Sequence, residues 1–345
     1  MPFRNIIGHR KLVALLSRSI ARETLPPSLI LSGPAGVGKR LAALSVAQTL
    51  NCLAPVRRGD SASGQTDDTP DVDACGTCAA CTRIARGVHP DVLFLEPNDK
   101  GNIKIEFVRE VIDRSGYRPF EGRRRVTIID QADGLERSAQ NALLKVLEEP
   151  PSASSFLLVT PSPDLLLPTV RSRCPQLRFR PLAVAEVAQA LIARGQSESE
   201  ARAVAALADG SIGRALDASA ETLVEARDVA LRVLVQAAGS DDVRRRMDCA
   251  KELVLKGAGA ASSERDQLAV YLRAMSILLR DIGALATSAD RALLANPDLT
   301  KALERLSVFG GERGRLAFVA VDRALAALDR YTNAKLVADW LVLQL

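Results

Sequence analysis

The stretch that decides the fold of this chain reads Gly33-Pro34-Ala35-Gly36-Val37-Gly38-Lys39-Arg40. It nearly matches the phosphate-binding loop G-x-x-x-x-G-K-[ST], in which glycines let successive backbone N–H groups converge on phosphate oxygens. The apolar run 29–31 predicts a buried parallel strand before the loop, and the Ala- and Leu-rich segment 41–50 predicts a helix after it. Because this order of strand, loop and helix is the context that the motif requires, we predict a nucleotide-binding fold.

The loop departs from the motif at its last position. The motif has Ser or Thr after the lysine, and that hydroxyl holds Mg²⁺, whereas Arg40 cannot ligate a cation. We expect the glycines and Lys39 to bind the phosphates of ATP or ADP, while Arg40 disfavours Mg²⁺. A glycine-containing turn without a ligand is the alternative interpretation.

Length and composition narrow the class of protein. A chain of 345 residues is long enough for two or three domains, and 47% hydrophobic residues can fill a sizeable core. With only 3% aromatic residues, stacking on exposed bases is not expected as a main binding mode. The formal charge of +5 fits contact with nucleic acid or an acidic partner, but also an ordinary solvated surface.

The sequence contains no apolar segment typical of a signal peptide or a membrane span, so we expect a cytoplasmic protein with no membrane partner. In that compartment the six cysteines are expected to be reduced or metal-bound. Cys52 and the run Cys75-x-x-Cys78-x-x-Cys81 suit a structural, tetrahedral Zn²⁺, with residues 53–74 as a polar surface loop. Reduced surface cysteines and a redox Cys-x-x-Cys pair are the alternatives.

Further strands follow the cysteine group. The run Val126-Thr127-Ile128-Ile129-Asp130 predicts a buried strand whose final Asp would orient Mg²⁺, although a turn or helix-cap role is the alternative for Asp130. Gln131 stands where hydrolytic members of this class need a Glu to activate water, and an amide cannot accept that proton. Strands are also predicted at 92–95, at 156–160 and at 176–180, and helices at 103–112 and 138–149. Together these residues predict an α/β domain with a parallel sheet over 1–180.

The character of the sequence changes after Pro181, where Ala- and Leu-rich helical segments continue without strands. We predict three domains. They are 1–180 with an inserted cysteine module at about 52–90, a small helical domain at 181–222, and a larger helical domain at 223–345.

At this point the residues resemble a known family, the bacterial clamp-loader AAA+ ATPases of DNA polymerase III. The motifs that carry the resemblance are Gly33–Lys39, Asp130, Asn141-Ala142-Leu143-Leu144-Lys145-Val146-Leu147-Glu148-Glu149-Pro150-Pro151, Ser172-Arg173-Cys174 and the three-cysteine run. The resemblance implies an AAA+ domain with a zinc module, a small helical lid and an all-α C-terminal collar. It also implies Zn²⁺ on Cys52, Cys75, Cys78 and Cys81, although the gap after Cys52 is longer than in the family.

Within this family the chain looks most like the delta-prime type, a stator with little or no ATPase activity of its own. Arg40, Gln131 and Gly213, the last at a position where motor subunits carry a phosphate-sensing arginine, all depart from the motor pattern. The resemblance implies that Arg173 reaches into a neighbouring subunit's nucleotide site as a trans arginine finger. The nucleotide-binding residues expected in the chain itself are Gly33, Gly36, Gly38, Lys39, Arg40, Asp130 and Thr160.

The implied partners are the gamma/tau motor subunits and the delta subunit, with the sliding clamp and primer-template DNA reached through the complex. The implied function is ATP-dependent clamp loading in DNA replication, as part of the polymerase holoenzyme. An ATP-hydrolysing gamma/tau-type motor subunit and an unrelated DNA-dependent AAA+ loader are the alternatives.

Overall fold

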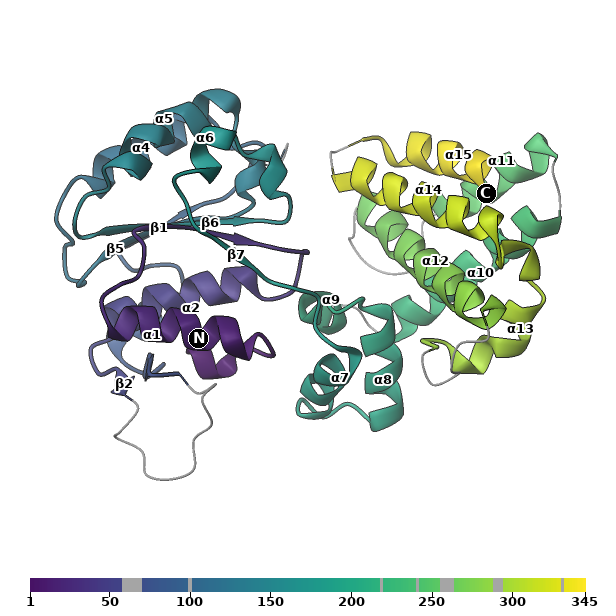
Figure 1. Cartoon of the computed structure of the whole chain (residues 1–345), viewed down its shortest axis with the longest axis horizontal. Coiled ribbons are helices and arrows are strands. Elements are labelled where there is room, and N and C mark those ends of the chain that lie inside the picture. The colour runs from purple at the N-terminus through teal and green to yellow at the C-terminus, as the bar shows by residue number, and fades with distance from the viewer. Residues whose placement is uncertain are drawn as a thin grey trace. The chain divides into compact units, whose positions relative to one another are not determined.

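The computed structural model describes residues 1–57, 70–98, 101–217, 220–239, 242–254, 264–287, 294–329 and 332–345. The chain divides into two compact units (Figure 1). The first contains Met1–Glu186 together with Ser211–Gly213, and the second contains Val187–Gly210 together with Arg214–Leu345.

The first unit is built on a five-stranded sheet in which every neighbouring pair is parallel. The strands are β1 (Ser28–Ser32), β4 (Val92–Leu95), β5 (Arg125–Ile129), β6 (Ser154–Thr160) and β7 (Gln176–Arg178), in the spatial order β4-β5-β6-β1-β7. The predicted α/β domain with a parallel sheet is therefore confirmed. The edge strand β7 ends two residues earlier than predicted, because its pairing with β1 stops at Arg178.

Helices cover both faces of this sheet (Figure 1). One face carries α1 (Arg10–Ala21) and α2 (Lys39–Asn51), and the other carries α4 (Ile105–Ser115), α5 (Arg137–Glu148) and the short α6 (Pro168–Arg171). Side chains of β6 alternate between the two cores, with Phe156 and Leu158 in one and Leu157 and Val159 in the other. Burial on both faces explains why the strands read as continuous apolar runs. Single 3₁₀ turns lie at Phe3–Asn5, Ala132–Gly134 and Pro163–Leu165.

The insertion after α2 holds more structure than the surface loop predicted for 53–74. A small antiparallel pair, β2 (Val56–Arg57) and β3 (Val72–Asp73), precedes α3 (Ala79–Ala85). Val72 and Ala74 are buried, so the prediction is wrong at the end of the segment. The reason is docking onto α1, where Ser17 Oγ donates to the carbonyl of Val72 at 2.6 Å. Residues 58–69 of the predicted loop lie outside the described residues.

A buried carboxylate organises the connection from α4 to β5. Asp91 accepts hydrogen bonds from the backbone N–H groups of Phe120, Glu121 and Gly122, at 2.7, 2.9 and 2.8 Å. It also accepts one at 2.9 Å from the guanidinium of Arg125. Burial works to raise the pKa of Asp91, but these donors outweigh it and lower the pKa to about 2.

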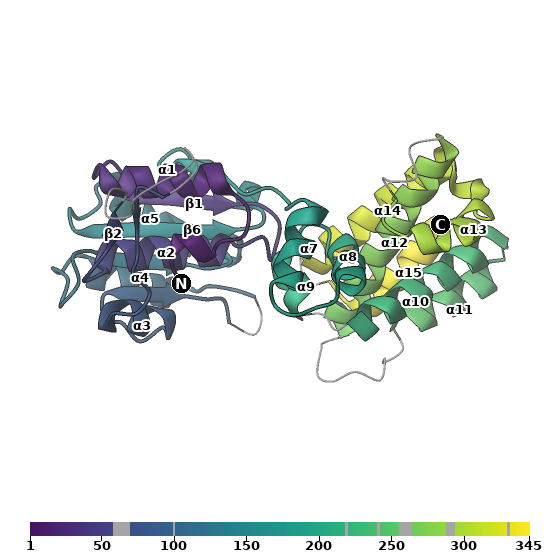
Figure 2. The ribbon, with the colours of Figure 1, turned by 90° about the horizontal axis from the view of Figure 1, so that it is seen from below.

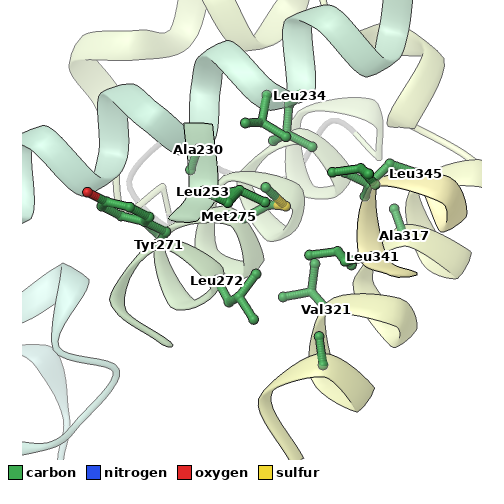
Figure 3. Close-up of a cluster of buried hydrophobic side chains, with 14 of the residues drawn as sticks. Ala230, Leu234, Leu253, Tyr271, Leu272, Met275, Ala317, Val321, Leu341 and Leu345 are labelled. Carbon is green, nitrogen blue, oxygen red and sulfur yellow. The ribbon is translucent and has the colours of Figure 1, made fainter. Parts of the chain in front are cut away.

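In its described residues the second unit contains only helices, which pack side by side (Figure 2). They are α7 (Val184–Ile192), α8 (Glu198–Leu207), α9 (Ile212–Asp217), α10 (Ala220–Gly239), α11 (Val243–Val254), α12 (Glu264–Ala286), α13 (Thr300–Glu304), α14 (Glu312–Asp329) and α15 (Ala334–Gln344); α7 and α9 begin in residues of the first unit. Two further 3₁₀ turns are Pro297–Leu299 and Ser307–Phe309. The core surrounds α12, whose Leu272 and Met275 meet Val321 and Leu341 from other helices (Figure 3). None of the described helices combines the length and the apolar character that crossing a membrane requires.

Candidate functional site

The phosphate loop connects the buried strand β1 to α2, as the sequence predicts. Gly33, Gly36 and Gly38 have φ angles of 137°, 75° and 103°, which residues with a side chain rarely adopt. Space also requires Gly33, since a Cβ there would lie 2.1 Å from the carbonyl oxygen of Phe179. A Cβ at Gly38 would meet no atom of the described residues within 4 Å, so among these residues the loop is open on that side.

Lys39 begins α2 at the base of the loop. Its side chain is buried, and Nζ donates to the carbonyl oxygens of Gly33 and Pro34, both at 2.6 Å. The first N–H groups of a helix have no partner within the helix, and the helix dipole adds partial positive charge at that end. The loop therefore has the features of an anion-binding site, in the fold from which nucleotide binding is expected.

Arg40 lies where a residue with a hydroxyl would help to hold Mg²⁺. Its Nη1 is 3.1 Å from Asp130 Oδ2, and its Nη2 is 2.5 Å from Glu96 Oε1. The guanidinium also lies over the ring of Phe94, 6.0 Å from its centre. These residues do not fit Mg²⁺, because the expected hydroxyl is missing and a fixed positive charge already occupies the carboxylate that would orient the metal.

Asp130 directly follows β5 and Thr160 is the last residue of β6, as predicted. The side chains of both residues form hydrogen bonds with other groups of the chain. Asp130 Oδ1 accepts from the N–H of Gln131 at 3.0 Å, and Gln131 has a φ of 47°, unusual for a residue other than glycine. Thr160 Oγ1 donates to Asp133 at 2.8 Å. In the described structure these two residues contact other protein groups at the carboxyl edge of the sheet.

Gly213 packs directly on the phosphate loop, within the first unit. Its N–H donates to the carbonyl oxygen of Gly36 at 2.9 Å, and a Cβ at this position would lie 3.1 Å from the Cα of Gly36. A larger residue at 213 would press on the loop. The close contact with Gly36 therefore explains why a glycine suits position 213.

Arg173 lies two residues after the end of the short helix α6, which spans Pro168–Arg171. The side chain of Arg173 is 30% exposed, and its Nη2 is 2.6 Å from Oε1 of Glu148, the last residue of α5. Nη1 donates to the carbonyl oxygen of Thr169 at 2.9 Å. The arginine is thus partly accessible and held by a carboxylate of its own chain.

The four cysteines predicted to bind a metal come together. Their Sγ atoms all lie within 4.8 Å of one another, and the Cys52–Cys78 and Cys75–Cys81 pairs are each 4.0 Å apart. Four thiolates around a tetrahedral zinc, with Zn–S near 2.3 Å, would have sulfurs about 3.8 Å apart. All four cysteines are free, so their sulfurs are available as ligands. Their spacing is close to that of a tetrahedral zinc site, so the cluster could hold a metal ion.

Hydrogen bonds and burial give the cysteine cluster the character of a metal site. Backbone N–H groups of Cys75, Cys78 and Cys81 donate to sulfurs of the cluster at 3.2 to 3.5 Å. Burial works to raise the pKa of Cys75, but N–H donors from Cys78 and Thr77 outweigh it and lower the pKa to about 6. Burial raises the pKa of Cys81. Because Cys52 and Cys81 are fully buried, surface cysteines are the wrong interpretation for these two.

Sequence reasoning missed the polar residues that support these sites. Glu96 and Glu148 pair with Arg40 and Arg173, and buried Gln48 donates to the carbonyl oxygen of Cys81 at 2.7 Å. Glu96 had a local signal, since it follows an apolar strand directly, as Asp130 does, and Glu148 lies in the run 141–151 that the sequence already marked; Gln48 had none.

Comparisons with known proteins agree with this arrangement. A sequence profile for the family described as DNA polymerase III, delta subunit, matches residues 8–183, just over half of the chain. DNA polymerase III subunit delta' of Pseudomonas aeruginosa is 35% identical over 206 residues, which cover 59% of this chain and 58% of that protein. DNA polymerase III subunit tau/gamma of Haemophilus influenzae is 33% identical over 189 residues, 55% of this chain and 25% of that protein. This chain thus matches less than two thirds of the length of either relative.

A gamma subunit-related protein of Thermotoga maritima covers 95% of this chain and 96% of its own, with 17% identity and a TM-score of 0.38, too low to support an argument. The profile match, the phosphate loop and the parallel sheet agree without it. The chain therefore belongs to the clamp-loader AAA+ family of DNA polymerase III, within the part that the delta-subunit profile describes.

Proposed function

We propose that this chain is a delta-prime-type stator of the clamp loader, which joins motor subunits and a delta subunit and supplies Arg173 to a neighbour's ATP site. The observation that carries the proposal is the contrast between two arginines. Arg40 is paired with Asp130 inside the chain's own site, whereas Arg173 is partly exposed after a short helix. The pairing of Arg40 with Asp130 disfavours ATP hydrolysis at the chain's own loop. The partly exposed position of Arg173 suits a side chain that acts on the ATP site of a neighbouring subunit.

The chemistry of the two sites supports the same division. Hydrolysis requires a metal to neutralise phosphate charge and a base to orient water. Arg40 and Gln131 stand at those two positions, and neither can perform the task. An arginine supplied in trans stabilises charge on the transferred phosphoryl group and is worth roughly 10³–10⁵ in rate at the site that it serves.

Reconstitution of the loader with Arg173→Ala tests the proposal. The variant should assemble normally, but DNA-stimulated ATP hydrolysis and clamp loading by the complex should be slower than with the wild type. The decrease should be smaller than the full effect of one arginine at its own site, because other subunits retain their own arginines. Arg171→Ala is the matched control, since this exposed arginine two residues earlier pairs with Asp164. Equal rates from wild-type, Arg173→Ala and control complexes would show that Arg173 is an ordinary surface residue.

Similarity to tau/gamma subunits keeps an ATP-hydrolysing motor as the second candidate. The isolated chain decides between the two. A stator should hydrolyse ATP negligibly, whereas robust turnover that Lys39→Ala abolishes would establish the motor. Copurification with clamp-loader subunits separates both from an unrelated DNA-dependent loader.

We also propose that the cysteine cluster binds one structural Zn²⁺ through Cys52, Cys75, Cys78 and Cys81. Four thiolates complete a tetrahedral shell and leave no position for water, so the metal would stabilise the module without taking part in catalysis. Elemental analysis of protein purified without chelator should give one zinc per chain. Cys249→Ser is the matched control, since this buried cysteine lies in α11, outside the cluster, and the variant should keep its zinc. Protein that contains no zinc would refute the assignment.

A further inference from the structure

Arg40 forms ion pairs with two carboxylates, and the loss of a metal-binding hydroxyl alone does not require this arrangement. The guanidinium links carboxylates from two strand ends, Glu96 after β4 and Asp130 after β5, at 2.5 and 3.1 Å. Asp130 is largely buried, whereas Glu96 and Arg40 are about half exposed. The positive group therefore lies at the carboxyl edge of the sheet, at the second residue of the helix that follows the phosphate loop.

A divalent cation would be disfavoured at this place for two reasons. The oxygen of Asp130 that points toward the loop helix is already bound, and a metal would be repelled by the guanidinium next to it. The same guanidinium offers donors that a metal does not. It has five N–H groups, and the two ion pairs use one from each of two nitrogens. Arginine binds phosphate oxygens well, because its planar donors match their geometry and its charge is permanent.

We infer that Arg40 replaces the divalent cation of this site, so that the loop binds a nucleoside di- or triphosphate without any metal. Lys39 and the open side of the loop at Gly38 provide the remaining contacts with the phosphates. The bound nucleotide would be retained, because the parts needed to cleave it are missing. This inference concerns the chain's own loop and does not depend on the role of Arg173.

Wild-type protein provides the first test. Binding of fluorescent ADP and ATP analogues is titrated in the presence of Mg²⁺ and again in excess EDTA. The expected dissociation constants differ by less than about twofold, because no metal takes part. Weakening of roughly tenfold or more in EDTA would overturn the inference, and so would no binding at all in either buffer. Absence of binding in both buffers would leave the stator proposal intact, because a stator does not need nucleotide in its own loop.

Two variants separate the charge of Arg40 from the missing hydroxyl. Arg40→Met removes the positive charge and should weaken binding by about tenfold in both buffers, as expected for the loss of charge-assisted hydrogen bonds. Arg40→Ser restores the hydroxyl of the motif and frees Asp130, so its binding should become dependent on Mg²⁺ and weaken by tenfold or more in EDTA.

The matched control is Arg18→Ser, which removes a similarly exposed arginine that pairs with Asp71 away from the loop. It should bind as the wild type does in both buffers. Circular dichroism checks that each variant is folded. Wild-type affinity in Arg40→Met, or an Arg40→Ser variant that ignores Mg²⁺, would show that Arg40 does not take the place of the cation.

Discussion

Asp91→Asn should destabilise the first unit far more than the size of the change suggests. The buried carboxylate accepts hydrogen bonds from three backbone N–H groups and from Arg125. Asparagine keeps the shape but carries no charge, so it resembles the protonated acid. It also leaves the buried guanidinium of Arg125 without its ion-pair partner, which is costly in a dry environment.

The lowered pKa of Asp91 gives the magnitude. A fall from 3.8 to about 2 corresponds to roughly 2 kcal/mol of stability held by the charged form. Loss of a buried ion-pair partner costs about 3–5 kcal/mol in other proteins, so we expect a decrease of about 2–4 kcal/mol in the free energy of unfolding at pH 7. Because the folded pKa lies below the unfolded one, this stability is present above about pH 4 and is lost as the pH falls toward about 2. At pH 3 only about half of the stability that the pKa shift supplies remains. The difference in unfolding free energy between wild type and variant should therefore be smaller at pH 3 than at pH 7.

Urea unfolding followed by circular dichroism measures this difference at both pH values. Asp164→Asn is the control, since Asp164 forms a shorter ion pair, 2.6 Å, but is exposed and should cost less than about 1 kcal/mol. Fluorescence of Trp340, the single tryptophan, reports on the second unit and should be unchanged. An Asp91→Asn effect no larger than that of Asp164→Asn, or one that is independent of pH, would refute the reasoning.

Three further outcomes are expected. Gly33→Ala should lower the thermal midpoint of the first unit much more than Gly38→Ala, because only position 33 faces a carbonyl oxygen at 2.1 Å; equal midpoints would contradict this. Glu148→Gln should raise ATP hydrolysis by the reconstituted loader by up to about fivefold, since it releases Arg173 from an exposed pair worth about 0.2–1 kcal/mol; a fall as large as that of Arg173→Ala would show that Glu148 positions the arginine instead. Cys52→Ser should reduce bound zinc and lower the thermal midpoint, and full zinc occupancy in this variant would remove Cys52 from the ligands.

The sheet was predictable from sequence because its strands are buried on both faces. A strand such as β6 must be apolar at successive positions, and this leaves a continuous run that periodicity detects. The phosphate loop was predictable for a different reason, since its backbone angles require glycine at fixed positions. In both cases the physical requirement acts on neighbouring residues and therefore appears as a local pattern.

The polar supports were not predictable because their partners are distant in the chain. Asp91 contacts residues about 30 positions away, and Asn51 Oδ1 accepts from the N–H groups of Arg123 and Arg124, more than 70 positions away. Such bonds place no periodic demand on the sequence around either partner. The buried strand β3 was missed for a related reason, because two residues are too few to show alternation and their burial depends on α1.

The phosphate loop also shows how a nucleotide-binding motif can be retained for structural reasons, whether or not nucleotide is hydrolysed. Lys39 bonds to two carbonyl oxygens of the loop, and the loop in turn accepts a hydrogen bond from Gly213. Gly33 is required by the approach of Phe179. These residues therefore stabilise the fold whether or not a phosphate is bound. Arg40 and Gln131 lie at the positions where catalysis makes its own demands, and there the chain departs from the motif. Retention of the glycines and the lysine is thus explained by structure, and the identity of the residues at 40 and 131 carries the information about activity.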